Sequence, residues 1–201
     1  MKKNIYITLI VGIVVVLMAI LLYAVFQKKD HEEVKLQPDD VDGVNNLIAN
    51  YSFESIIDPD NDWSVNAELP YANFGYDNFT KYDSAASFVL VSDAEDQPPI
   101  FLLQKIKSIK PDRKLNLFGF VRTEDCDSAR LELELHDKNS LIIKVFSDCA
   151  KGTTDWTEYN AWIKTFLPDN VVEGDLYVIV KCVVYSRGRA WFDEIRLYSL
   201  P

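Results

Sequence analysis

Two glutamates two positions apart are the residues of this sequence whose spacing best suits acid–base chemistry. Glu132 and Glu134 alternate with leucines in the run E-L-E-L-H-D. In an extended strand their carboxylates would share one face about 7 Å apart, a separation that a pair of catalytic carboxylates could use. The run matches no catalytic pattern, and the chain offers only His31 and His136 as histidines. We therefore interpret the pair as a solvated strand face and predict that the protein is not an enzyme.

A second group of residues combines aromatic rings with polar side chains that can hydrogen-bond hydroxyl groups. Its members share the faces of their segments that lie opposite the apolar positions. They are Phe120, Glu134, His136, Trp162, Lys181 and Tyr185. If these faces belong to one sheet, the mixture would suit a saccharide, with Trp162 as the best single ligand candidate. The alternative is that a loop covers these rings.

The stretch from Tyr71 to Tyr82 is a second candidate surface. It reads YANFGYDNFTKY, with almost no aliphatic residue among its aromatic ones. Exposed aromatic loops often bind ligands. A loop that packs its own rings over the edge of the fold is an equally good interpretation.

The cysteines are the remaining reactive side chains. If the segments around 129–136 and 141–147 form a hairpin, residues whose numbers sum to about 278 face each other. This register would place Cys149 near Cys126, so a disulfide between them is feasible and would stabilise by about 3 kcal/mol. Cys182 should remain a buried thiol. Three free thiols are the alternative.

The elements that must position these residues are short segments with two-residue alternation, separated by Gly, Pro, Asn and Asp. The clearest expected strands are 87–91, 100–106, 115–122, 129–136, 141–147, 158–166, 176–185 and 190–198, with a short one near 47–54. Leu131, Leu133 and Leu135 should face the core. The pattern predicts an all-β fold, a two-sheet antiparallel jelly-roll β-sandwich, preceded by one transmembrane helix.

The order of motifs resembles the galactose-binding-like jelly-roll carbohydrate-binding modules, with their many xylan- and β-glucan-binding members. The motifs are NLIANYSFE, YDSAASFVLV, KPDRKLNLFGFVRTED, GTTDWTEY and RAWFDEIRLYSL. The resemblance covers about residues 45–200 and implies a noncatalytic β-sandwich that binds glycans. It also implies a structural calcium ion held by Glu54 and Asp193, because calcium takes six to eight oxygen ligands. The alternative is that these carboxylates accept hydrogen bonds from nearby backbone N–H groups.

The N-terminal segment predicts a membrane anchor. The 22 residues from Ile5 to Phe26 carry no charge and would span about 33 Å as a helix, which matches a bilayer. The segment lacks a cleavage site of the A-x-A type, so residues 1–29 are predicted to remain as an anchor. We expect the N-terminus in the cytoplasm, an acidic tether at 30–44 and an extracytoplasmic galactose-binding-like domain at 45–201.

The charge of the chain limits its partners. Its formal net charge is −10, which argues against nucleic acid as a partner. Together these features predict a noncatalytic carbohydrate-binding module that holds a glycan or cell-envelope polysaccharide near the membrane. The alternative is a protein-docking or scaffold domain of a cell-envelope complex built on the same sandwich.

Overall fold

The computed structural model describes residues 45–55, 63–66, 70–83, 85–169, 171–172 and 174–201. The segment Val44–Pro201 forms one compact unit. Its described residues form strands and no helix, so the predicted all-β class is confirmed. The predicted anchor and tether lie outside the described residues. Within the described ranges, no helix has the length and apolar character needed to cross a membrane.

Nine strands make up the described fold. They are β1 (Ser64–Val65), β2 (Ala72–Asp77), β3 (Ser87–Ser92), β4 (Ile100–Lys107), β5 (Lys114–His136), β6 (Leu141–Phe146), β7 (Ala150–Lys164), β8 (Tyr177–Tyr185) and β9 (Gly188–Leu200). The strand expected near 47–54 is absent, because positive φ angles at Asn50 and Phe53 turn the chain there. Only Asn46 makes a bridge, to Tyr198 of β9.

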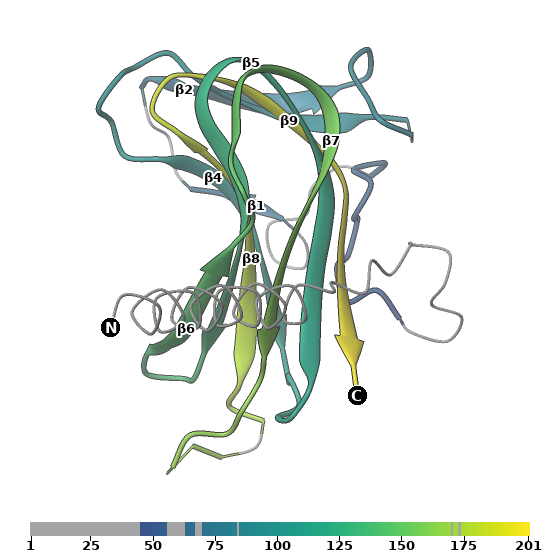
Figure 1. Ribbon diagram of the computed structural model, residues 1–201, viewed down its shortest axis with the longest axis vertical. Helices are drawn as coiled ribbons and strands as arrows, with labels where there is room; N and C mark the ends of the chain where they lie inside the picture. The colour runs from purple at the N-terminus through teal and green to yellow at the C-terminus, as the bar shows by residue number, and fades with distance from the viewer. Residues whose placement is uncertain (1–44, 56–62, 67–69, 84, 170, 173) are drawn as a thin grey trace, which may run out of the picture. The chain divides into compact units, whose positions relative to one another are not determined.

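The strands pair antiparallel in one continuous sheet, in the order β1-β4-β8-β5-β9-β3-β2, with β6 and β7 also paired to β5. Strand β5 has 23 residues and joins the two segments predicted as separate strands. Its first half pairs with β7 and β9, and its second half pairs with β6 and β8. Figure 1 shows β5 and β7 curling over at one end of the domain. The predicted two sheets are therefore two layers of one curled sheet.

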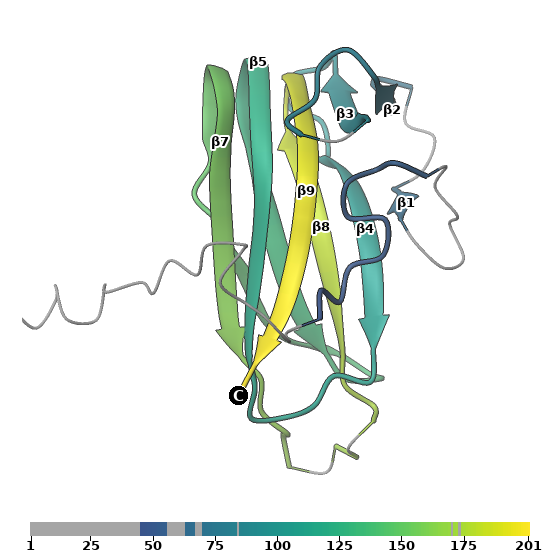
Figure 2. The ribbon, with the colours of Figure 1, turned by 90° about the vertical axis from the view of Figure 1, so that its right-hand side faces the viewer.

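We name these layers by their central strands. The β9 layer contains β2, β3, β9, the first half of β5 and β7, and the β8 layer contains β1, β4, β8, the second half of β5 and β6. Figure 2 shows the strands of the domain from the side, with β7, β5 and β9 adjacent. Strand β5 belongs to both layers. In each layer, alternate side chains of β5 face the core, and the side chains between them face outward.

The core lies between the layers. Leu131, Leu133 and Leu135 are fully buried, as predicted. A side chain on Gly119 could not fit, because a Cβ there would lie 2.3 Å from Cδ1 of Ile195 and 3.1 Å from Cδ1 of Leu131. This glycine therefore leaves room for the side chain of Ile195 from the neighbouring strand β9 and lets β5 approach Leu131 of the facing layer closely.

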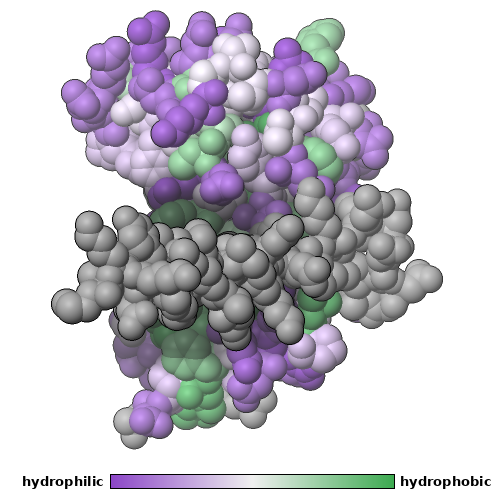
Figure 3. Space-filling view, viewed as in Figure 1, coloured by the Kyte–Doolittle hydropathy of each residue, from purple (hydrophilic) through white to green (hydrophobic). Residues whose placement is uncertain are grey.

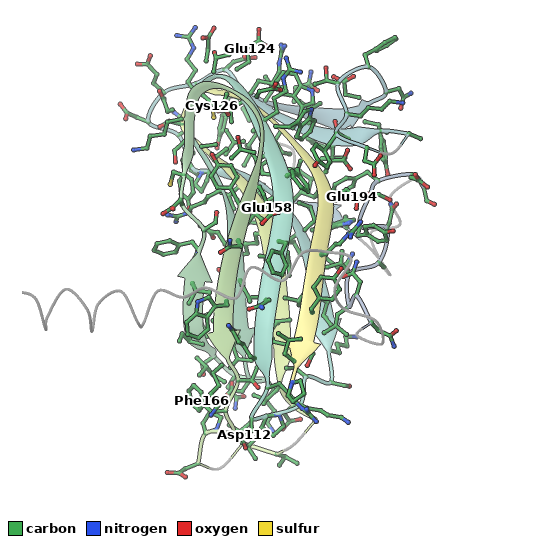
Figure 4. All side chains as sticks on the ribbon, turned by 45° about the vertical axis from the view of Figure 1, so that its right-hand side comes forward. Asp112, Glu124, Cys126, Glu158, Phe166 and Glu194 are labelled. Atoms are coloured by element: carbon green, nitrogen blue, oxygen red, sulfur yellow. The ribbon has the colours of Figure 1, made fainter. Side chains whose placement is uncertain are left out.

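The turn between β8 and β9 packs against the bend of β5. Gly188 has a φ of 132°, and a Cβ there would lie 2.3 Å from the Cα of Cys126. The N–H of Asp127 donates to the carbonyl oxygen of Arg187 at 2.9 Å. Figure 4 places Cys126 and Glu124 at this end of the domain, and Phe166 and Asp112 at the opposite end. The turn thus fixes the place where the sheet passes between layers.

The predicted disulfide between Cys126 and Cys149 is not formed in this structure, in which all three cysteines are free thiols. The hairpin register is as predicted from Glu132 to Leu135. Beyond these residues β5 pairs with β7, where Ala129 faces Ala150 and Cys126 faces Gly152. Cys149 therefore lies about four residues along the strand from Cys126, or about 13 Å, too far for a disulfide.

Candidate functional site

The six residues predicted to bind a ligand lie on two outer faces rather than one. Phe120 and Trp162 project from the β9 layer, because their neighbours Val121 and Ile163 are buried in the core. The other predicted residues project from the β8 layer. These are Glu134, His136, Lys181 and Tyr185. The condition that all six share one sheet face is therefore not met, since β5 changes layers between Phe120 and Glu134.

Two buried carboxylates form the centre of the outer face of the β8 layer, which we call the β8 face. Glu132 is 1% exposed and Glu134 is 5% exposed, so their interpretation as a solvated strand face is wrong. Lys144 explains their burial, because its Nζ lies 2.6 Å from Oε2 of Glu132 and 3.2 Å from Oε1 of Glu134. One ammonium group thus bridges the two carboxylates.

Each carboxylate has further partners of its own. Nη2 of Arg130 lies 2.7 Å from Oε1 of Glu132. The hydroxyl of Tyr185 donates to the same oxygen and accepts a hydrogen bond of 2.8 Å from Arg130. Glu134 is paired with Lys181 at 2.7 Å and with Nε2 of His136 at 3.1 Å. The β8 face is therefore a connected network of charges.

The network keeps both carboxyls ionised. Burial alone would raise the pKa of Glu132, but hydrogen bonds from Lys144, Tyr185 and Arg130 outweigh it and lower the pKa. Burial likewise opposes ionisation of Glu134, yet Lys181 and His136 lower its pKa. The pKa of Lys144 is raised, because the two glutamates outweigh its own burial. Neither carboxyl is thus suited to donate a proton near neutral pH.

Aromatic rings frame this network. The guanidinium of Arg130 lies 4.1 Å from the ring centroid of Phe146, whose side chain is 55% exposed. Nζ of Lys105 lies 3.6 Å from the ring centroid of Tyr177. The His136 ring also stacks on Tyr177, with centroids 5.0 Å apart. In the space-filling view, apolar residues lie between hydrophilic areas in the lower half of the domain (Figure 3). The β8 face thus offers cations together with ring faces.

Three residues of this site, Arg130, Lys144 and Phe146, were not among the candidates predicted from the sequence. A usable signal existed for two of them. The hairpin register that was inferred for the cysteines places Lys144 opposite Glu134 and Phe146 opposite Glu132, as the structure does. Arg130 could have been selected because it shares the face of Glu132 by alternation.

The β9 layer carries a separate set of rings. Trp162 is 52% exposed, and Nζ of Lys114 lies 4.8 Å from its ring centroid. Phe120 is stacked on Tyr82 with centroids 3.6 Å apart, so one face of its ring is covered. Trp162 therefore remains an exposed ring on this face, without the ionic network of the other.

The aromatic stretch from Tyr71 to Tyr82 is partly a strand rather than a loop. Its residues Ala72–Asp77 form β2, which pairs with β3. The rings of Phe74 and Tyr76 contact the buried Phe88, whereas Phe79 is 97% exposed. The stretch thus combines rings that contact the sheet with rings that remain partly or fully exposed, so both interpretations stay open.

The residues expected to bind calcium differ in their surroundings. Asp193 is fully buried, and its oxygens accept the N–H groups of Glu194 at 2.8 Å and of Tyr82 at 2.9 Å. Glu54 is exposed in the turn before the undescribed residues. The described ranges contain no cluster of three or more His, Cys, Asp or Glu side chains arranged for a metal. A calcium ion bound by these two carboxylates would also need backbone carbonyl oxygens, which this ion accepts as ligands.

Comparison with known proteins identifies the fold. No family model matches the chain, and no curated protein matches it. Among solved structures, the xylan-binding CBM22-1 domain of Xyn10C from Paenibacillus barcinonensis has a TM-score of 0.55 at 11% identity, covering 80% of this chain and 97% of that one. TmCBM61 in complex with β-1,4-galactotriose has a TM-score of 0.50 at 15% identity. The match covers 76% of this chain and 97% of TmCBM61.

Other similar structures are enzymes. The enzymatically active domain of tailspike protein 4 from bacteriophage CBA120 has a TM-score of 0.60 at 16% identity over 77% of this chain, but this chain spans only 21% of the tailspike chain. The Stig cyclase Fisc from Fischerella sp. TAU has a TM-score of 0.57 at 14% identity. The match covers 79% of this chain and 98% of the cyclase. The domain therefore has a jelly-roll fold of the kind found in carbohydrate-binding modules, a fold that also occurs in enzymes.

Proposed function

We propose that this domain is a noncatalytic carbohydrate-binding module whose ligand lies across the β8 face. The module is extracytoplasmic, and the N-terminal anchor holds its glycan or cell-envelope polysaccharide near the membrane. The observation that carries the proposal is the network of Glu132, Glu134 and their cationic partners, framed by the exposed ring of Phe146. Rings stack on the C–H faces of pyranoses, and charged groups hydrogen-bond their hydroxyls.

The protonation state of the β8 face supports a noncatalytic role. A glycosidase needs one carboxyl that stays protonated until it donates to the leaving group. The pKa of Glu132 and that of Glu134 are both lowered by their partners. The two most buried carboxyls of this face therefore lack the proton that such a reaction requires.

Replacing Phe146 by alanine is expected to weaken polysaccharide binding about fivefold, because one stacking ring contributes about 1 kcal/mol. The measurement is affinity electrophoresis of the full chain in gels that contain xylan, β-glucan or β-1,4-galactan. Trp162→Ala is the matched control, since its ring is 52% exposed against 55% for Phe146 but lies on the other layer. It should leave binding unchanged.

The reverse result, in which Trp162→Ala loses binding and Phe146→Ala keeps it, would move the ligand to the β9 layer. If the folded chain binds no polysaccharide, the protein-docking alternative becomes the better explanation.

The proposal includes a structural calcium ion held by Glu54 and Asp193 with backbone oxygens. Calcium at a hundred times its dissociation constant would stabilise by about 2.7 kcal/mol, which corresponds to a rise in Tm of about 5–10 °C over that in chelator. Glu54→Gln should abolish this difference. Glu158→Gln, also at an exposed position, should not.

Asp193 is the poorer residue to replace, because its loss removes two acceptors of backbone N–H groups whether or not calcium binds. The calcium assignment is wrong if the wild-type Tm is the same in calcium and in chelator.

A further inference from the structure

The β8 face has the opposite charge to the protein as a whole. The chain has a formal net charge of −10. By contrast, alternation along β4, β5, β6 and β8 places five cationic side chains on this face and two carboxylates. The cations are Lys105, Lys107, Arg130, Lys144 and Lys181, and the carboxylates are Glu132 and Glu134. The face therefore carries an excess of positive charge.

The two signs of charge lie at different depths. The side chains of Glu132 and Glu134 are 2% and 7% exposed, whereas that of Lys144 is 32% exposed. Lys105 and Lys107 of the neighbouring strand are exposed. The carboxylates thus hold the cations in place from below, and the groups that meet an arriving ligand are predominantly cationic.

The lysines retain donors for a ligand. An ammonium group has three N–H donors. Lys181 directs one of them to Glu134 at 2.7 Å. Lys105 lies over the ring of Tyr177, and its ammonium group pairs with no carboxylate of the described residues. Such groups can bind an acidic substituent while the neighbouring rings support the sugar.

We propose that the ligand of the β8 face is an acidic polysaccharide, whose pyranose rings carry carboxylate or similar anionic groups. This inference rests on the proposed function and specifies its substrate class. The net positive charge of the face would steer such a polymer to it, and the exposed ring of Phe146 would distinguish a sugar chain from a simple polyanion.

The test is affinity electrophoresis of the full chain, in a nonionic detergent, through gels that contain polygalacturonate or its highly methyl-esterified form. The two probes share a backbone and differ in charge. Polygalacturonate should retard the protein at least about tenfold more strongly, and retardation should fall in about 0.5 M salt because screening weakens exposed ion pairs. Lys105→Gln/Lys107→Gln should weaken binding about tenfold. Lys81→Gln/Lys164→Gln removes the same charge from exposed positions outside the face and should have no effect.

Equal or stronger binding of the esterified form, or of neutral xylan or β-glucan, would overturn the inference but leave the proposed function standing. A folded chain that binds none of these polymers would overturn both. Dextran sulfate tests the nature of the acidic group. Binding that depends on both Phe146 and the two lysines supports the proposal with sulfate as the acidic group. If Phe146→Ala leaves the binding of dextran sulfate unchanged, the binding is nonspecific and electrostatic, and this result overturns the proposal.

Discussion

Gly188→Ala is expected to lower the free energy of unfolding by about 3 kcal/mol or more. The residue has a φ of 132°, which an alanine adopts only under strain, and its new Cβ would lie 2.3 Å from the Cα of Cys126. Because that contact is with backbone, no side-chain rotation relieves it. Urea denaturation of the variant and the wild type measures the loss.

Two other glycines separate the causes of this effect. Gly174 has a φ of 105°, but a Cβ at this residue would have no atom within 4 Å, so Gly174→Ala should cost about 1–2 kcal/mol through backbone strain alone. Gly75 has neither feature, and Gly75→Ala should change stability by less than about 0.5 kcal/mol. If Gly188→Ala costs no more than Gly174→Ala, the packing of the β8–β9 turn on the bend of β5 is not what makes glycine necessary there.

Glu132→Gln is expected to destabilise the domain by about 2–4 kcal/mol at neutral pH. The substitution preserves the shape of the side chain but leaves Arg130 and Lys144 without the carboxylate they share. Glu124→Gln is the matched control, since Glu124 also pairs with an arginine, Arg189, at 3.1 Å, but both side chains are about half exposed. That pair should contribute less than about 1 kcal/mol. Chemical denaturation of both variants gives the comparison.

The effect of Glu132→Gln should depend on pH with a defined sign. Because the folded-state pKa of Glu132 is lowered, its ionised form contributes stability above the unfolded pKa of about 4.3, and this contribution is lost as pH falls through the folded pKa. The difference between variant and wild type should therefore shrink below about pH 4. A difference that stays constant from pH 7 to pH 3 would show that the charge of Glu132 contributes nothing.

Alternation and hairpin register predicted much of the fold. Leu131, Leu133 and Leu135 face the core because apolar residues repeat every second position there. The register around Lys138 to Ser140 was correct from Glu132 to Leu135, and at Cys126 the observed partner, Gly152, again follows it. That register sets Cys149 opposite residue 129, three residues along the strand from Cys126, and the bulge near Ala129 adds one more, so the hairpin separates the two cysteines.

The candidate site was harder to predict, for two physical reasons. Alternation assigns residues to a strand face but not to a layer, so Trp162 and Lys181 could not be separated before β5 was known to cross between layers. Burial of a carboxylate depends on its neighbours across strands rather than along the chain. Glu134 is covered because Lys144 and Lys181 meet it from two different strands.

The continuity of β5 has a mechanical consequence. A polymer held on the β8 face would pull on the second half of β5, whereas the chain enters the domain at Asn46, which bridges to Tyr198 of β9. Strand β9 pairs with the first half of β5. Tension between such a polymer and Asn46 would then run lengthwise along β5 and load the β5–β9 hydrogen bonds in shear, so that they break together and not one after another. The lifetime of such a domain under force is set by its unfolding rate.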